Sequence, residues 1–232
     1  KAGSGLPDVD EPTVDLFAAE TSALLAWTLY LLRPLLDGVS PLIAPRIERE
    51  VQLRILTPLL VREDFGWMGF MRQRVNNWNP WICSNWLTSA LLIEGDEARR
   101  LETVVKAMRT LDHFIDRYPK DGGCDEGPGY WGRAGASLYD CLELLHNATG
   151  GKIDVYGDPL VREIGKFIYR VQIAERYFIN FADAPAMVVP LPALVYGYGR
   201  RIDDPAMAAL GAWAANRQDV RNRGVSDSIG RQ

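Results

Sequence analysis

The chain has 232 residues, of which 47% are hydrophobic and 24% are charged, and its formal net charge is -4. This composition is typical of a globular protein large enough to bury a core, and it excludes an intrinsically disordered chain. No cluster of lysines and arginines is large enough to neutralise a run of phosphates, so we expect no nucleic-acid partner.

Cysteine spacing and hydropathy exclude further classes of protein. The three cysteines show no CxxC spacing, so the sequence predicts free thiols at Cys83, Cys124 and Cys141 rather than a disulfide framework or a zinc site. The apolar run over residues 23–36 contains Arg33 and is interrupted by Pro34. It therefore predicts a buried helix, and we expect no contact with a membrane.

Hydrophobic periodicity predicts helices along almost the whole chain. Apolar residues recur at helical spacing from Leu16 to a stop at Asp37 and Gly38. Further helices are predicted over residues of about 45–59, 84–94, 96–118, 134–147, 159–176, 186–198 and 205–216. Strand-like alternation is limited to residues 152–156. The predicted fold is all-α, with residues 1–215 as antiparallel helical hairpins in an α/α toroid or partial ring, and residues 216–232 as a polar linker.

Two short blocks carry the most unusual residues. NNWNPWICSNW, from Asn76 to Trp86, packs three tryptophans and four asparagines into one window, and DGGCDEGPGYWGR follows from Asp121 to Arg133. A buried amide must find partners, and an exposed indole leaves apolar area in water. A surface that stacks flat polar rings explains both residue types. Both blocks fall in predicted loops or helix starts, so we expect them on one rim.

These two blocks resemble sequences of a known protein family. NNWNPWICSNWLTSALLIE, followed by a helix and then by DGGCDEGPGYWGRAGASLYDCLELL, resembles the heparinase II/III-like polysaccharide lyases over roughly residues 15–183. The resemblance implies an α/α toroid, a C-terminal β-sandwich domain in the parent chain, and cleavage of a uronic-acid-containing polysaccharide by β-elimination. It gives Asn85 the role of facing the uronate carboxylate and Tyr130 the role of proton transfer. Trp86 and Trp131 stand where the family often has histidines.

The expected chemistry accounts for these residue types. β-Elimination removes the C5 proton of the uronate, whose acidity is poor while the adjacent carboxylate stays negative. An amide donor such as Asn85, with Arg133, would stabilise the enolate-like anion. A tyrosine in water has a pKa of about 10, so Tyr130 can protonate the leaving oxygen directly, and it can act as a base beside a cation. Neither a metal nor a cofactor is required.

The remaining site predictions concern binding of an acidic polysaccharide or oligosaccharide. We expect sugar contacts from tryptophans of both blocks and from polar residues of the second block and of the loop before Pro185: Trp78, Trp81, Trp86, Glu126, Trp131, Arg133, Asn180 and Asp183.

Several alternatives remain open from the sequence. Asp125 and Glu126 match the paired carboxylates of a glycoside hydrolase. A carbohydrate-binding scaffold without catalysis is a third function. Structural roles compete at single positions, because Asn85 would also cap a helix, Tyr130 could pack and the tryptophans could fill a core. Asp121 is best explained by a turn with the two glycines that follow it.

Overall fold

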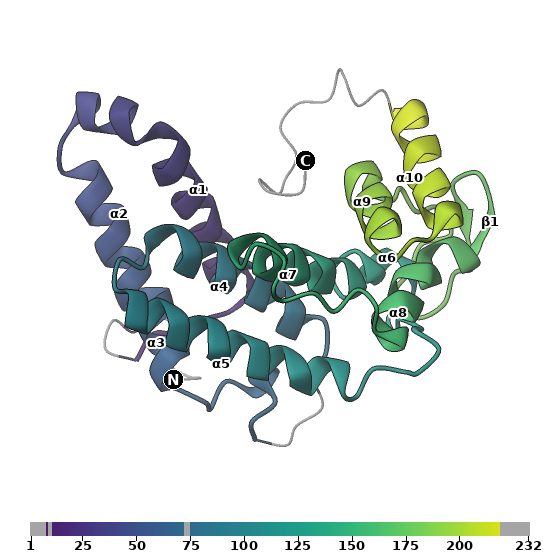
Figure 1. Cartoon of the computed structure of the whole chain (residues 1–232), viewed down its shortest axis with the longest axis horizontal. Coiled ribbons are helices and arrows are strands. Elements are labelled where there is room, and N and C mark those ends of the chain that lie inside the picture. Colours follow the sequence, from purple (N-terminus) through teal and green to yellow (C-terminus); the bar gives the residue numbers. More distant parts are fainter. Residues whose placement is uncertain (1–7, 9–10, 72–74, 219–232) are drawn as a thin grey trace. The chain divides into compact units, whose positions relative to one another are not determined.

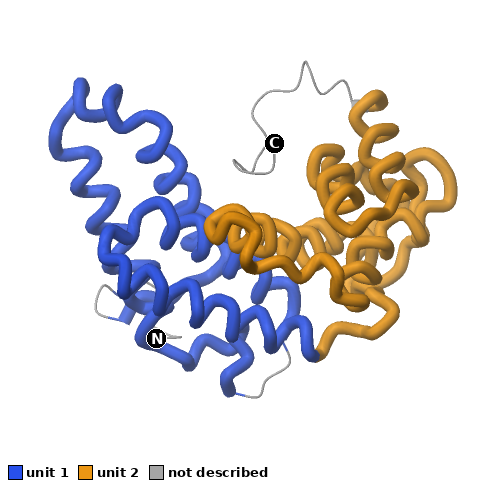
Figure 2. The backbone as a smooth tube through the Cα atoms, viewed as in Figure 1, with its two compact units in different colours: residues 1–116 blue, residues 117–232 orange. Residues whose placement is uncertain are grey.

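The computed structural model of the chain is mainly helical and divides into two compact units, residues 1–116 and 117–232 (Figures 1 and 2). It describes residue 8 and residues 11–71 and 75–218. The prediction of a mainly helical fold is confirmed. The last helix extends to Gln218, past the predicted start of the linker at 216, and the rest of that linker lies outside the described residues.

Unit 1 is built from helical hairpins. Its helices are α1 (Leu16–Val39), α2 (Ile43–Val51), α3 (Thr57–Val61), α4 (Trp78–Ile93) and α5 (Glu97–Ile115), with a 3-10 turn at Gly66–Met68. Short connections join α1 to α2 and α4 to α5, and both pairs pack together. Side-chain caps fix two of the starts, since the Asp15 carboxylate accepts the Ala18 N–H at 2.8 Å and Asp96 accepts the Arg99 N–H at 3.1 Å.

A π-helical turn, Gln52–Leu56, joins α2 to α3 without a break in the helix. Pro58 follows it directly. Proline has no N–H, and its ring collides with the carbonyl of the fourth residue before it, here Arg54. The widened turn, in which the Thr57 N–H donates to the Gln52 carbonyl, gives that ring space. The predicted helix over 45–59 is thus present, with a local change of geometry that proline explains.

The core of unit 1 forms where α1 packs on α4. Ala19 and Ala26 of α1 are fully buried, and such small side chains let two helix backbones approach closely. A buried hydrogen bond of 2.8 Å joins the hydroxyl groups of Ser22 and Ser89 across this contact. The position of α4 relative to α1 is therefore fixed by both shape and polar pairing.

Helix α4 begins six residues before the predicted start at Ser84. Proline usually interrupts a helix, so the sequence predicts a start after Pro80. The first turn of a helix tolerates proline, however, because the N–H groups of that turn have no intrahelical partner. Asn77 is the N-cap residue, without a side-chain capping bond. The alternative that Asn85 caps this helix is wrong, because Asn85 lies inside it.

Glu94, at the end of α4, is a carboxylate with only 6% of its surface exposed. It accepts hydrogen bonds from Gln52 Nε2 at 3.0 Å, from the Asp96 N–H at 3.0 Å and from Arg99 Nε at 3.4 Å. Burial alone would raise the pKa of this group, but the hydrogen bonds and the Arg99 charge outweigh burial and lower it. Glu94 thus ties the π-helical turn to the loop between α4 and α5.

We expect Glu94→Gln to lower the free energy of unfolding by about 1–3 kcal/mol at pH 7, because the amide leaves buried donors unpaired. A lowered folded pKa contributes stability that is present above the unfolded value and is lost as the pH falls through the folded value. The difference between the wild-type and variant proteins should therefore shrink as the pH falls below the ordinary glutamate pKa of about 4.3. Urea unfolding at pH 7 and pH 3 measures this, and a difference independent of pH would contradict it.

Unit 2 contains α6 (Pro128–Trp131), α7 (Gly135–Ala148), α8 (Pro159–Arg170), α9 (Pro192–Arg201) and α10 (Pro205–Gln218). A two-stranded antiparallel hairpin, β1 (Gln172–Ala174) with β2 (Tyr177–Phe178), follows α8. Helix α8 therefore ends six residues before its predicted end at residue 176, and α9 starts six residues after its predicted start at 186. Residues 152–156, to which strand-like alternation is limited in the sequence, form bends, a turn and irregular structure.

Helices α9 and α10 pack closely because glycines line their contact. A Cβ atom at Gly199 would lie 2.5 Å from the Ala208 nitrogen, and one at Gly211 would lie 2.4 Å from the Tyr196 nitrogen. Tyr198 is fully buried beside this pair, and its hydroxyl donates to the Val161 carbonyl of α8 at 2.7 Å. The core of unit 2 thus joins α8 to the α9–α10 hairpin.

Candidate functional site

Three of the predicted site residues share one face of α4 in unit 1. Trp78, Trp81 and Asn85 are spaced by three and four residues, which places them one above another on a helix. Trp78 is 38% exposed, and the other two are half-buried. This row, the α4 stripe, combines two accessible indoles with one accessible amide. Its length of about 10 Å follows from a rise of 1.5 Å per residue.

The amide of Asn85 is oriented by its own helix. Its Nδ2 donates to the Trp81 carbonyl at 2.8 Å, and the Ser84 hydroxyl donates to the same carbonyl at 2.9 Å. An amide nitrogen carries two hydrogens, so one N–H of Asn85 is held by this bond and the second can serve a ligand. The position of Asn85 inside α4 also removes the helix cap as an explanation for this residue.

Trp81 is anchored by α1. Its indole Nε1 donates to Glu20 Oε1 at 2.7 Å, and the ring keeps part of its surface exposed. Trp78 lies one turn earlier, where its backbone N–H donates to the Asn76 side chain at 3.1 Å. Because the Trp81 indole is held by its bond to Glu20, it offers a flat apolar face at a low entropic cost of binding.

Trp86 and Trp131 are core residues, with 0% and 2% of their surface exposed. Trp131 stacks on Tyr198 with ring centroids 6.5 Å apart, and its Nε1 donates to the Ile164 carbonyl at 2.8 Å. A side chain without exposed surface cannot stack on a sugar, so the predicted substrate contacts of these two tryptophans do not fit the structure. The positions at which the resemblance leads one to expect histidines are filled by packed indoles.

In unit 2 the glycine-rich block packs against the loop that contains Asn180 and Asp183. Gly127 has φ +84°, and a Cβ there would lie 2.6 Å from the Phe181 carbonyl oxygen. A Cβ at Gly129 would lie 3.1 Å from Cδ of Pro185. Only a residue without a side chain permits this approach at Gly127. The fold therefore brings together two predicted site segments that are about 50 residues apart in sequence.

Tyr130 lies in α6, directly after this contact, and is 37% exposed. Among the described residues its hydroxyl has no hydrogen-bond partner, so the phenol is accessible to a ligand. Its carbonyl accepts the N–H groups of Arg133 at 2.8 Å and Ala134 at 3.0 Å, which fixes the backbone on its C-terminal side.

The other predicted residues of these two segments differ in exposure. Asn180, Asp183 and Asp125 are exposed, and Glu126 and Arg133 are half-buried. Asp125, Glu126 and Arg133 each interact with other residues. The turn predicted at Asp121 is confirmed, because its carboxylate accepts the Gly123 N–H at 3.0 Å.

The prediction of free thiols is confirmed, since Cys83, Cys124 and Cys141 form no disulfide bond and are buried. Burial raises the pKa of the Cys124 thiol to about 11, so it is protonated at neutral pH. A buried, protonated thiol is a poor nucleophile. The cysteine in the glycine-rich block is therefore a packing residue.

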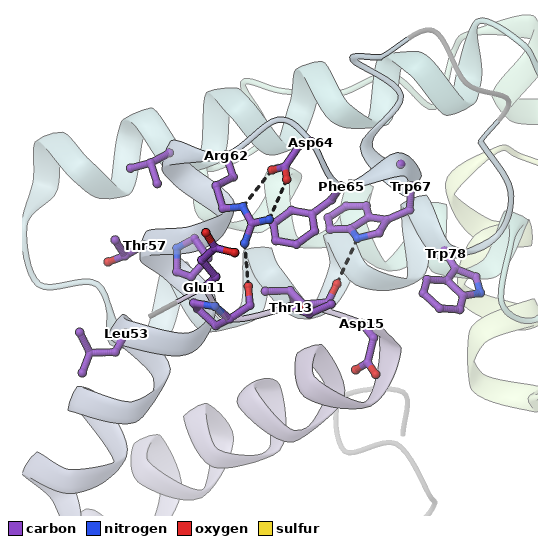
Figure 3. Close-up of a pocket in the computed structure, with 15 residues that line it drawn as sticks. Glu11, Thr13, Asp15, Leu53, Thr57, Arg62, Asp64, Phe65, Trp67 and Trp78 are labelled. Atoms are coloured by element: carbon purple, nitrogen blue, oxygen red, sulfur yellow. Dashed lines mark hydrogen bonds and ion pairs between the residues drawn. The ribbon is translucent and has the colours of Figure 1, made fainter. Parts of the chain in front are cut away.

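Sequence reasoning missed a cavity of about 1020 Å³ in unit 1 (Figure 3). It is lined by the extended segment 11–15, by Leu53 of the π-helical turn, by α3, by the loop from Arg62 to Trp67 and by Trp78. In Figure 3, Trp78 lies at one end of this lining, and Leu53 and Thr57 lie at the other. The sequence does not predict this cavity, because segments about 50 residues apart, 11–15 and 62–67, come together to form it.

The described residues contain no group of three or more His, Cys, Asp or Glu side chains that could hold a metal ion. Within the same ranges, no helix combines the length and the apolar character that crossing a membrane requires.

The chain matches no protein-family model, and no curated protein is significantly similar to it.

Proposed function

We propose that this chain is the helical part of a polysaccharide lyase of the heparinase II/III-like kind, with its hairpins arranged in an α/α toroid. It cleaves a uronic-acid-containing polysaccharide by β-elimination. The observation that carries the proposal is the α4 stripe, in which Trp78 and Trp81 offer stacking faces and Asn85 offers an oriented amide. Indole and amide groups on one accessible face are what a sugar with a carboxylate requires.

Asn85 neutralises the uronate carboxylate in this mechanism. Its second Nδ2 hydrogen donates to a carboxylate oxygen, and the bond strengthens as charge moves onto that group during removal of the C5 proton. The bond from Nδ2 to the Trp81 carbonyl, 2.8 Å long, holds the amide in place before substrate arrives. A donor that is already oriented needs no reorganisation during the reaction.

Tyr130 transfers the proton. Its partly exposed oxygen, as a phenolate beside a cation, takes the C5 proton of the uronate, and the phenol so formed gives this proton to the leaving glycosidic oxygen. The contacts of Gly127 and Gly129 with residues 181–185 hold α6 in position, and exposed Asn180 and Asp183 flank it as hydroxyl-binding groups. This assignment rests on unit 2 alone, as that of Asn85 rests on unit 1.

The proposal is tested by incubating the chain with uronate polymers and following the ultraviolet absorbance of the unsaturated product. Its appearance supports β-elimination. New reducing ends without unsaturated product would instead support a hydrolase that uses Asp125 and Glu126. Retention of the polymer without cleavage would support a binding scaffold. Because the parent chain of a lyase of this kind includes a β-sandwich domain, the assay is run on the longer chain as well.

Asn85→Ala is expected to reduce the rate of unsaturated product formation about 10- to 100-fold, which corresponds to one hydrogen bond to a charged group, about 1.5–3 kcal/mol. The loss should fall mainly on kcat, because the bond strengthens in the transition state. Asn147→Ala, which changes an exposed asparagine on α7, is the matched control. Equal rates for Asn85→Ala and wild type would remove Asn85 from the mechanism.

A further inference from the structure

Helix α1 has an apolar side that stays exposed in the described part of the chain. Ala19 and Ala26 face the core, where α1 packs on α4. A helix that is apolar on all sides is normally buried on all sides. The outer side of α1 therefore fits a second apolar surface. Its exposed large side chains, on the side away from the core, are Phe17, Leu24, Leu31, Leu32, Leu35 and Val39.

The exposed side chains have the spacing of a helix–helix contact. Phe17, Leu24 and Leu31 recur every seven residues, and Leu35 follows four residues later. Such a repeat forms one stripe along a helix, which packs against a second helix with the same repeat. None of the residues in this row is charged, so two such rows meet without charge repulsion. The row, here called the α1 seam, consists of Phe17, Thr21, Leu24, Thr28, Leu31 and Leu35.

A cavity of about 500 Å³ opens beside the first half of α1. Its apolar lining includes Phe17 and Leu25 of α1, with Val51 from the end of α2 and Ile55 from the π-helical turn. The first half of α1 therefore offers a hollow with apolar walls at one end of the seam.

The charged groups that also line this cavity are already hydrogen-bonded. Arg54 Nε donates to Glu50 Oε2 at 2.6 Å, and the carboxylates of Asp8 and Asp15 each accept a backbone N–H. These groups need no polar partner from a second molecule. The apolar lining is thus left to receive an apolar side chain.

The second half of α1 has the opposite shape, because its apolar side chains protrude. Leu35 and Val39 keep 70% and 79% of their surface exposed. One half of the helix offers an apolar cavity, and the other half offers apolar side chains that fit one. Two copies of α1 satisfy both halves when they run in opposite directions.

We propose that α1 packs antiparallel against α1 of a second copy of this chain, about a two-fold axis at the level of Ala26. Phe17 of one copy then lies level with Leu35 of the other, because both residues are equally far from Ala26 along the helix. Leu35 and Val39 of each copy enter the cavity beside Phe17 of the other, and the two-fold axis makes this contact twice. Parallel packing would place the two cavities together and leave them unfilled.

The area involved is that of a weak and reversible dimer. Burial of the two seams with their flanking side chains removes on the order of 1,000 Å² of surface, against about 1,600 Å² in a standard interface. We therefore expect a dissociation constant in the micromolar range. All of these groups belong to unit 1 and none has a role in the proposed lyase reaction. The dimer is tested without substrate, and the two proposals stand or fall separately.

Sedimentation equilibrium tests the dimer. The mass of the wild-type chain should rise from that of a monomer towards that of a dimer as the protein concentration passes through the micromolar range. Leu24→Glu, which puts a carboxylate of each copy near the two-fold axis, should remain a monomer throughout. Leu35→Glu, at a more exposed position, should do the same, and it replaces Leu24→Glu if that variant loses helix content by circular dichroism.

Leu101→Glu is the matched control, because Leu101 is an exposed leucine of α5 outside the seam. It should dimerise like wild type. A wild-type chain that stays a monomer at every concentration would overturn the proposal. Equal loss of the dimer in Leu24→Glu and Leu101→Glu would show a general effect of added charge and would also overturn it.

Cross-linking tests the direction of packing. A short bis-maleimide should join Phe17→Cys to Leu35→Cys in a mixture of the two variants, and it should join neither variant to itself. In antiparallel packing the two copies of residue 17 lie about 27 Å apart along the helices, at a rise of 1.5 Å per residue. Wild type is the control, since its three cysteines are buried. Linkage of Phe17→Cys to itself would show parallel packing and end the proposal.

Discussion

Replacing Tyr130 with phenylalanine is expected to reduce formation of unsaturated product about 10²- to 10⁴-fold, the usual contribution of a general acid or base. The change removes only the hydroxyl. That group is accessible and has no hydrogen-bond partner among the described residues, so the fold should lose almost nothing. Initial rates from ultraviolet absorbance, with the free energy of unfolding from urea denaturation, measure the two effects separately.

The control for this substitution is Tyr196→Phe, which removes the hydroxyl of another exposed tyrosine of unit 2, in α9. Its activity should equal that of wild type. Full activity in Tyr130→Phe would exclude Tyr130 as the proton donor. Equal losses in both variants would point to a general effect on unit 2 rather than to chemistry at Tyr130.

Gly122→Ala is expected to lower the free energy of unfolding by about 3–5 kcal/mol. Gly122 has φ +76°, which costs an L-residue about 1–2 kcal/mol. A Cβ there would also lie 2.2 Å from the carbonyl carbon and oxygen of Glu163, so the backbone of α8 would have to move. Chemical denaturation of the variant, monitored by circular dichroism, measures the loss.

Gly150→Ala separates the two causes. Gly150 also has positive φ, +59°, but a Cβ there would meet nothing within 4 Å. It should therefore lose only about 1–2 kcal/mol, the conformational part of the effect. Equal losses at Gly122 and Gly150 would show that the contact between the glycine-rich block and α8 is not tight.

Helix positions could be predicted where caps and periodicity agree. Helix α1 starts at Leu16 and ends beside Gly38, as its apolar spacing predicts, and Asp96 caps α5. The β1–β2 hairpin was missed because a short run of apolar residues does not distinguish a strand from a buried helix. Glu175, with φ +48°, turns the chain there, and an L-residue in that conformation leaves no signal in the sequence.

The candidate site was predictable only in part, and α4 shows why. Trp78, Trp81 and Trp86 are the same residue type in one block, yet two keep exposed surface and the third is fully buried. All three indoles lie on α4 because the helix starts at Trp78 rather than near Ser84. The side of the helix on which each indole lies then decides whether it points to the core. The pairing of Arg62 with the Pro12 carbonyl depends on long-range folding, which periodicity does not reveal.

The π-helical turn before Pro58 has a consequence for the cavity that ends at Trp78 (Figure 3). A ring closed from residue i to i+5 holds one residue more than an α-helical ring, so it changes the angular phase of everything before it relative to α3. An α-helix rotates by about 100° per residue. Leu53, inside the π-helical turn, and Thr57, the first residue of α3, both line the cavity. The turn that accommodates Pro58 therefore helps to set which side chains of residues 43–61 face the cavity.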